Sequence, residues 1–128
     1  MTFVTTEKIV LPVKPVLVIF DCDGVLVNSE PIANHILAES LTAEGYACTF
    51  EESVRRFLGR DLPAIIQEVE RKLGQQLSDG FFDRLRANTY AAFRKHLKPV
   101  PGIDAALDCI LFPKCVASSG PPEKIRLS

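Results

Sequence analysis

The sequence lacks a block of basic residues. Its 15 Lys and Arg nearly balance its 16 Asp and Glu, which leaves a formal net charge of −1, and the two signs are interspersed along the 128 residues. Proteins that bind nucleic acids typically carry a clustered basic surface, which this chain does not supply. We therefore expect no nucleic-acid partner, whereas a small neutral or anionic substrate stays open.

The four cysteines lack the spacings of a zinc site. Cys22, Cys48, Cys109 and Cys115 form no CxxC pair and have no histidine at metal-ligand spacing. Scattered free thiols in an ordinary composition are typical of a reducing compartment. The sequence thus predicts a cytoplasmic protein without a zinc centre.

A long apolar run is also missing. No stretch approaches the ~20 residues that a membrane helix needs, and no positively charged segment precedes the apolar residues near the N-terminus. Residues 1–15, interrupted by Pro12 and Pro15, are predicted to be a loosely attached leader. We therefore expect no membrane contact.

The organising feature of the chain is the stretch Val16–Glu30, VLVIFDCDGVLVNSE. Its apolar run is too short for a helix, so it predicts a buried strand at the centre of a parallel sheet. Two acids, Asp21 and Asp23, follow at the C-terminal end of this strand, and Gly24 comes next. In open α/β sheets, ligands bind beyond the carboxyl ends of the strands. Both carboxylates are therefore expected where chemistry takes place.

Residues 31–97 have the apolar spacing of amphipathic helices and no strand signal, which predicts an inserted helical bundle. Glycines are expected to end three of the helices, at Gly45, Gly59 and Gly74. N-caps are expected at Ser29, at Thr49 (in a capping box with Glu52), at Asp61 and at Ser78. On the fourth helix the predicted inward stripe is Phe82, Leu85, Thr89, Phe93 and Leu97.

After the helical segment the chain returns to strand-like sequence. Lys98–Gly102, KPVPG, is a stiff joint rich in proline. It is followed by a predicted helix at 103–110, a second buried strand at Cys115–Ala117, the residues Ser118–Gly120 and another helix from Pro121. The predicted fold class is therefore α/β, a parallel sheet with an inserted helical bundle.

Asp21, Asp23 and Ser118 suit phosphoryl transfer. Asp21 can attack phosphorus as a carboxylate nucleophile, and Asp23 can protonate the leaving alcohol and then activate water. Mg²⁺ would neutralise phosphate beside carboxylate, and Ser118 could hold a phosphate oxygen. Two plainer alternatives stay open: D-x-D-G is also ordinary turn chemistry, and Ser118–Gly120 taken alone is typical of a cap or a turn.

The order of the motifs (hydrophobic strand, DCDGVLVNSE, helical insertion, PVPG joint, CVASSG) resembles the haloacid dehalogenase superfamily of phosphatases, in particular its β-phosphoglucomutase-like branch. The resemblance covers 16–128 and implies a partial Rossmann-like core (16–30 and 98–128) with a helical cap (31–97). It implies Asp21 as nucleophile and Asp23 as acid/base, with Mg²⁺ held by the Asp21 carboxylate and the Asp23 backbone carbonyl. The implied phosphate-binding residues are Ser118, Ser119 and Gly24.

Two departures from the family pattern affect what we expect. Asn28 stands where this branch more often has Asp. Members also continue past the serine motif to a lysine and an acidic pair, and Lys124 follows Ser118 too closely to be that lysine. We therefore expect a fragment of a longer phosphatase that lacks the C-terminal half of the core, with its first strand left as an exposed apolar edge and with little activity of its own.

The resemblance also places a substrate-reading loop of the cap at Phe57–Arg60. Gly59 would let the backbone approach a ligand, and Arg60 would contact a sugar or a second anionic group; the alternative is a helix stop and a surface charge. The predicted function is a Mg²⁺-dependent phosphatase of small phosphorylated metabolites, such as sugar phosphates or 6-phosphogluconate. The alternatives are phosphoglucomutase-type transfer and a catalytically inert fragment.

Overall fold

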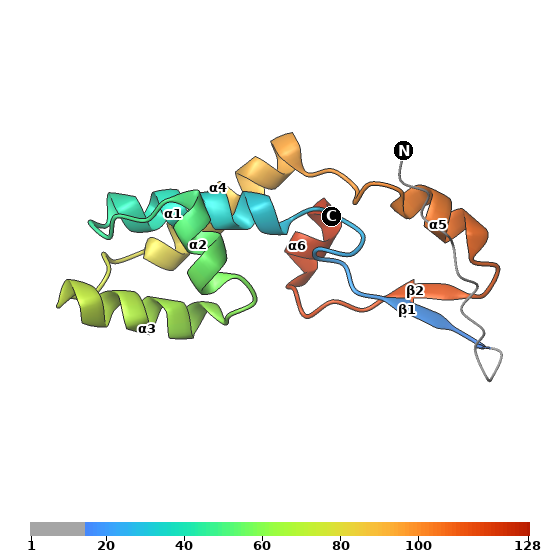
Figure 1. Cartoon of the computed structure of the whole chain (residues 1–128), viewed down its shortest axis with the longest axis horizontal. Coiled ribbons are helices and arrows are strands. Elements are labelled where there is room, and N and C mark those ends of the chain that lie inside the picture. The colour runs from blue at the N-terminus through green and yellow to red at the C-terminus, as the bar shows by residue number, and fades with distance from the viewer. Residues whose placement is uncertain (1–14) are drawn as a thin grey trace, which may run out of the picture.

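The computed structural model describes residues 15–128 (Figure 1), so the predicted leader lies outside the described residues apart from Pro15. Figure 1 shows an elongated molecule with two lobes. We call α1–α4 the helical lobe, and the two strands with α5 and α6 the strand lobe. The elements are β1 (Val18–Phe20), α1 (Glu30–Ala43), α2 (Phe50–Phe57), α3 (Leu62–Leu73), α4 (Phe81–His96), α5 (Ile103–Cys109), β2 (Lys114–Val116) and α6 (Pro122–Leu127). This is the predicted architecture, a small parallel sheet with a helical insertion.

The helical lobe packs around one apolar core. Leu41 on α1 and Val69 on α3 are fully buried, and Phe57 on α2 and Phe81 on α4 are 2% and 3% exposed. Each helix therefore turns an apolar stripe inward, as the spacing predicts. No helix within residues 15–128 is long and apolar enough to cross a membrane.

Local side-chain chemistry sets two of the helix starts. The Thr49 Oγ1 accepts a hydrogen bond from the Glu52 N–H at 3.2 Å, and the Thr49 N–H donates to the Glu52 carboxylate at 2.9 Å, which confirms the capping box of α2. The Asp61 carboxylate accepts from the Ala64 N–H at 3.1 Å and caps α3. Gly74 ends α3 in the left-handed conformation, with φ of 70°.

Two other predicted caps differ from the structure. Ser29 precedes α1 but makes no capping bond, because its hydroxyl donates to Asp23 instead. Ser78 does not begin α4, because its N–H donates to the Glu44 carboxylate at 2.9 Å and its hydroxyl also contacts Arg84. The helix begins two residues later, after Gly80. Ser29 therefore keeps the predicted N-cap position but not the capping bond, whereas the cap predicted at Ser78 is wrong.

The inward stripe of α4 also differs from the prediction. Phe82 is 51% exposed, whereas its neighbour Phe81 is 3% exposed and lies in the core. Leu85 and Phe93 are buried as predicted, and Tyr90 completes the buried set. Phe81 and Phe82 are one helical position apart, so the same stripe could accommodate either ring; packing against α1–α3 selects the first.

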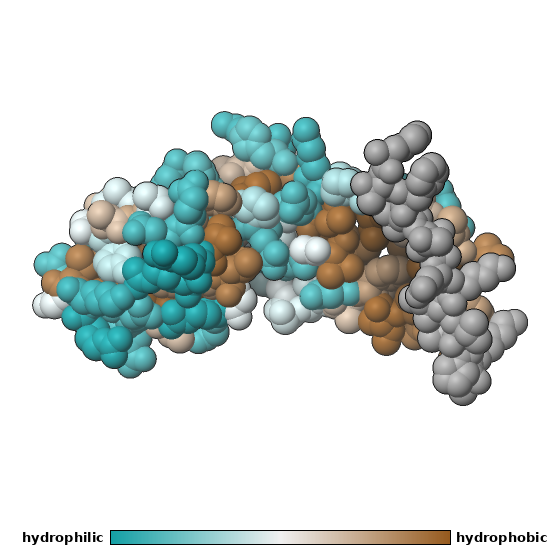
Figure 2. Space-filling model, in the orientation of Figure 1, coloured by the Kyte–Doolittle hydropathy of each residue, from teal (hydrophilic) through white to brown (hydrophobic). Residues whose placement is uncertain are grey.

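The sheet consists of β1 and β2, paired in parallel with Phe20 opposite Val116. The predicted burial of both strands is wrong. Ile19 is 61% exposed and Val116 is 52% exposed, since within the described residues each strand has only the other as a neighbour. The expected exposed apolar edge is confirmed, and Figure 2 shows apolar surface on the strand lobe.

Candidate functional site

The loops that carry Asp21 and Ser118 begin side by side. Because β1 and β2 are parallel and in register, both chains leave the sheet at the same edge. The Ala117 N–H donates to the Phe20 carbonyl at 2.8 Å, which continues the ladder to the last residue before Ser118. The topology thus brings the start of both predicted motifs to one edge, where open α/β sheets bind ligands.

The first loop is tight and is anchored at both ends. Cys22 and Val27 are 5% and 6% exposed, and the Gly24 N–H donates to the Val27 carbonyl at 2.9 Å. Gly24 has a φ of 71°, and a Cβ added to it would lie 3.1 Å from the Glu30 carboxyl carbon. The positive φ therefore favours glycine here, whereas the Glu30 side chain is exposed and could move away from a Cβ.

The two aspartates have different environments. Asp21 is exposed, and its carboxylate accepts a hydrogen bond from the Cys22 N–H at 2.7 Å. Asp23 is half-buried, and both of its oxygens are engaged: Oδ1 accepts from the Ser29 hydroxyl at 2.7 Å, and Oδ2 accepts from Lys124 Nζ at 2.7 Å. Asp23 is therefore held in place, whereas Asp21 faces solvent.

The surroundings of Asp23 favour its anionic form. Burial raises the pKa of this carboxyl group, but the hydrogen bonds from Lys124 and Ser29, together with the positive charge of Lys124, outweigh burial. The net result is a pKa below the ordinary value. For Asp23 to carry and donate a proton, its contacts with Lys124 or Ser29 would therefore have to change first.

Lys124, which follows Ser118 too closely to be the family's lysine, was not predicted to contact the site. It lies on α6, 101 residues from Asp23, and only the pairing of β1 with β2 brings the two together. The hydrogen bond from Ser29 to Asp23 was not predicted either, although Ser29 does stand at the N-cap of α1. Its place in the DCDGVLVNSE motif was an available signal for a role near the aspartates, whereas no local signal marks Lys124.

The loop after β2 is organised by its own serine. The Ser118 Oγ accepts a hydrogen bond from the Gly120 N–H at 3.1 Å, which is the turn geometry of the plainer alternative. Ser118 is half-buried and Ser119 is exposed. Binding of a phosphate by either residue stays a prediction.

A cavity of about 350 Å³ lies between the two lobes. Asp23, Ser29 and Lys124 line it near the strand lobe, while Gly59 and Arg60 line it from the helical lobe. The remaining lining is largely apolar and includes Leu37, Phe57, Leu58, Ile65, Phe82, Leu85 and Phe93. Asp21, Gly24, Ser118 and Ser119 are not part of this lining. An apolar cavity with a few polar groups is typical of a small-molecule site.

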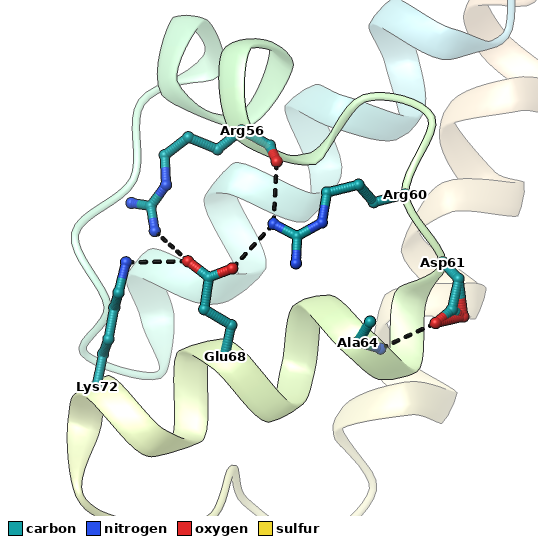
Figure 3. A network of polar contacts seen from close by, with 6 residues as sticks. All are labelled: Arg56, Arg60, Asp61, Ala64, Glu68 and Lys72. Atoms are coloured by element: carbon teal, nitrogen blue, oxygen red, sulfur yellow. Dashed lines mark hydrogen bonds and ion pairs between the residues drawn. The ribbon is translucent and has the colours of Figure 1, made fainter.

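Arg60 reaches the cavity but is already paired. Its Nη1 donates to the Glu68 carboxylate at 2.9 Å and to the Arg56 carbonyl at 3.2 Å (Figure 3). Arg56 and Lys72 bind the other Glu68 oxygen, at 2.7 and 2.9 Å. A ligand anion would have to compete with Glu68 for Arg60. Gly59 has a φ of 74° with nothing within 4 Å of an added Cβ, so its backbone conformation alone requires glycine.

Glu68 makes the stability of the helical lobe depend on pH. Hydrogen bonds from Lys72, Arg60 and Arg56 lower its pKa from 4.5 to about 2. A lowered folded-state pKa contributes stability above the unfolded value, and this contribution is lost as the pH falls through the folded value. We expect Glu68→Gln to reduce the midpoint of urea unfolding at pH 6. The difference from the unsubstituted chain should shrink between pH 4.5 and about 2.

A matched control for this experiment is Glu51→Gln. Glu51 lies exposed on α2 and has no ion pair among the described residues. Its substitution should shift the midpoint far less at pH 6. An equal shift for both variants, or a Glu68→Gln shift that persists unchanged at pH 2, would show that the Arg56–Arg60–Lys72 contacts do not stabilise the fold.

The oxygen donors near the strand ends fit a hard cation. Within residues 15–128, no three His, Cys, Asp or Glu residues cluster as a metal site. The Asp21 carboxylate and the Asp23 backbone carbonyl are available, since no backbone N–H in the described part of the chain donates to that carbonyl. Mg²⁺ usually takes one or two carboxylates and completes its shell with water and substrate phosphate. This donor set therefore fits such an ion.

The sequence matches known proteins along most of its length. The profile of the haloacid dehalogenase-like hydrolase family matches residues 18–111. The 6-phosphogluconate phosphatase of Escherichia coli K12 is 35% identical over 112 residues, which are 87% of this chain and 51% of that protein. The phosphoglycolate phosphatase of Rhodobacter capsulatus is 27% identical over 92 residues, which are 70% of this chain and 42% of that protein.

The fold matches as well. The crystal structure of a conserved haloacid dehalogenase-like protein of unknown function from Agrobacterium tumefaciens has a TM-score of 0.78 and 32% sequence identity. The match covers 88% of this chain and 50% of that one. The chain thus spans about half the length of the curated relatives that it matches.

Proposed function

Because the chain belongs to the haloacid dehalogenase-like hydrolase family, we propose that it acts on phosphate monoesters of small metabolites, with Asp21 as the nucleophile. The observation that carries this proposal is the parallel register of β1 and β2, which starts the Asp21 and Ser118 loops at one edge of the sheet. Similarity to two proteins named as phosphatases supports the same reaction class.

The proposed reaction has two steps. In the first, an Asp21 carboxylate oxygen forms a bond to phosphorus while the bond from phosphorus to the alcohol oxygen breaks, and Asp23 gives its proton to that leaving oxygen. In the second, Asp23 takes a proton from water, the water oxygen attacks phosphorus, and the bond to Asp21 breaks. The products are the alcohol and free phosphate, and both aspartates return to their starting states.

The remaining residues of the site bind and orient the substrate in this proposal. The Asp21 carboxylate and the Asp23 backbone carbonyl would hold Mg²⁺, which would supply positive charge to offset phosphate beside carboxylate. Ser118 and Ser119 hold phosphate oxygens, and Gly24, which has no side chain, lets the backbone of the first loop come close to them. The free state of all four cysteines supports a cytoplasmic location.

The substrate we propose is a sugar phosphate or a sugar-acid phosphate such as 6-phosphogluconate. The 350 Å³ cavity has room for a compact molecule. Arg60 lines the cavity from the helical lobe, where a carboxylate or a second anionic group of the substrate could replace Glu68 as its partner. Gly59 precedes it and leaves open space for the ligand.

A second candidate is binding of phosphate compounds without turnover. It is favoured by the lining of the cavity, which includes Asp23 and Lys124 but not the proposed nucleophile Asp21. Release of phosphate from p-nitrophenyl phosphate and 6-phosphogluconate, with Mg²⁺ or with EDTA, separates the two. Mg²⁺-dependent release supports the phosphatase, and saturable binding of 6-phosphogluconate without release supports the second candidate.

A further inference from the structure

The ion pair between Lys124 and Asp23 connects the two motif loops. Lys124 comes from α6, which follows the Ser118 loop, and Asp23 lies in the loop after β1. Their side chains are 27% and 29% exposed, and the distance from Nζ to Oδ2 is 2.7 Å. Both residues line the cavity between the lobes. This pair is thus positioned where a substrate of the proposed reaction would enter.

The path of the Lys124 side chain is defined by its neighbours. A Cβ added at Gly120 would lie 3.3 Å from the Lys124 Cδ and 3.3 Å from the Ser118 Oγ. The methylene stem of Lys124 therefore passes close to the serine loop on its way to Asp23. Its stem thus lies beside the proposed phosphate-binding loop, and its ammonium group lies on Asp23.

The charges around the cavity single out Lys124. The cations that line it are Arg60, Arg86 and Lys124. Arg60 and Arg86 pair with Glu68 and Asp83 of their own lobe, at 2.9 and 2.8 Å, and neither acid lines the cavity. The partner of Lys124, in contrast, is the acid that the proposed reaction uses. An anion that enters beside Asp23 would compete directly for this ammonium group.

The hydrogen bonds of Asp23 show which of its partners can change. Its Oδ1 accepts from Ser29 and its Oδ2 from Lys124, so a leaving group that approaches either oxygen meets one of these two partners. Ser29 is 2% exposed and adjoins the start of α1, which fixes its position. Lys124 is attached through a long flexible stem. Of the two partners, Lys124 is the one that can move.

We propose that Lys124 exchanges partners: it holds Asp23 in the arrangement seen here and turns to the phosphate group when a phosphate compound binds. This inference rests on the proposed function, because it assumes a phosphate site at the Ser118 loop. The exchange places a positive charge on the phosphate and frees one Asp23 oxygen at the same moment. Lys124 is then a phosphate-binding residue on α6, outside the two sequence motifs that carry Asp21 and Ser118.

The test is a double-mutant cycle of inorganic phosphate binding to the full chain. Titration calorimetry at a fixed pH and without added metal would compare the unsubstituted chain, Asp23→Asn, Lys124→Met and the double variant. Removing the competing carboxylate releases Lys124, so Asp23→Asn should bind phosphate about tenfold more tightly when Lys124 is present. In the Lys124→Met background the same substitution should change affinity less than about threefold.

Three further variants make the result specific. Lys124→Arg should restore most of the gain, because it keeps a cation on a long stem. Lys98→Gln removes an exposed lysine without an ion pair in residues 15–128, and should leave the gain intact. Asp21→Asn removes an acid that does not pair with Lys124, so its effect on phosphate affinity should be the same with Lys124 and with Met at that position.

The outcomes separate this inference from the function it rests on. Phosphate binding with an equal Asp23→Asn gain in both Lys124 backgrounds would overturn the exchange and leave the proposed function standing. Absence of phosphate binding in every variant would contradict the proposed phosphate site and the exchange together. Lys124→Met keeps the methylene stem beside Gly120, and the Arg variant provides the second route if the Met variant does not fold.

Discussion

Replacing Asp21 with asparagine is expected to abolish the Mg²⁺-dependent release of phosphate from p-nitrophenyl phosphate. An amide is a far weaker nucleophile than a carboxylate, so the covalent step loses its attacking atom. We expect a loss of roughly 10³-fold or more in kcat, which is the order seen when a hydrolase loses its nucleophile. The fold should persist, because Asp21 is exposed and its described hydrogen bond is with the neighbouring Cys22 N–H.

The matched control for this substitution is Asp108→Asn. Asp108 is an exposed acid on α5 of the strand lobe, without an ion pair among the described residues. Its substitution makes the same change of charge and should leave turnover within about twofold, because it touches neither motif loop. Turnover that survives Asp21→Asn while folding is intact would assign the chemistry to another residue.

Replacing Asp23 with asparagine is expected to have an effect that depends on the leaving group. General acid–base catalysis typically contributes about 10²- to 10⁴-fold. A sugar alkoxide needs a proton as it leaves, so turnover of 6-phosphogluconate should fall by that order. p-Nitrophenolate leaves without one, so formation of the intermediate from p-nitrophenyl phosphate should fall much less. Pre-steady-state release of p-nitrophenolate measures that step separately from the later attack of water.

The same substitution offers an internal check on the role of Asp23. If Asp23 only held Lys124 in place, both substrates would lose activity by the same factor. Ser29→Ala is a useful companion, because it removes the hydrogen bond to Oδ1 and leaves the carboxylate present. We expect it to weaken turnover of both substrates less than Asp23→Asn weakens that of 6-phosphogluconate.

Helix boundaries could be predicted where the determining contacts are local. Thr49 and Asp61 find their partners three residues away, and these contacts exist whenever the helix forms. Ser78 instead bonds to Glu44, 34 residues away. A serine satisfies either partner, and only the packed fold decides between them. The mistaken cap at Ser78 therefore reflects competition between a local and a distant acceptor.

The burial of the strands could not be predicted from their residues alone. The apolar run at Val16–Phe20 identifies a strand correctly, but exposure depends on what packs beside it. Ile19 has the same side chain whether or not a third strand covers it, and within the described residues it stays 61% exposed. The residue types predict that a strand has an apolar face. They do not show which other segment, if any, packs against that face.

The motif residues of the candidate site could be predicted from the sequence, but the ion pair between Lys124 and Asp23 could not. Asp21, Asp23 and Ser118 stand out because their residue types follow strands at positions where α/β folds bind ligands. Lys124 carries no such mark, because a lysine on a short helix is ordinarily a solvated charge. Its contact with Asp23 exists only because parallel pairing of β1 and β2 brings residues 101 positions apart together.

The most direct test of the account is to find the phosphoryl group on Asp21. The Asp23→Asn variant is incubated with Mg²⁺ and acetyl phosphate, whose leaving group needs no proton, and is quenched in acid before peptide mapping by mass spectrometry. Without the base that activates water, the phosphorylated chain should accumulate. We predict one added phosphoryl group on the peptide that contains Asp21, and none when Asp21→Asn is combined with Asp23→Asn. An unmodified chain, or a phosphoryl group on another residue, would contradict the central claim.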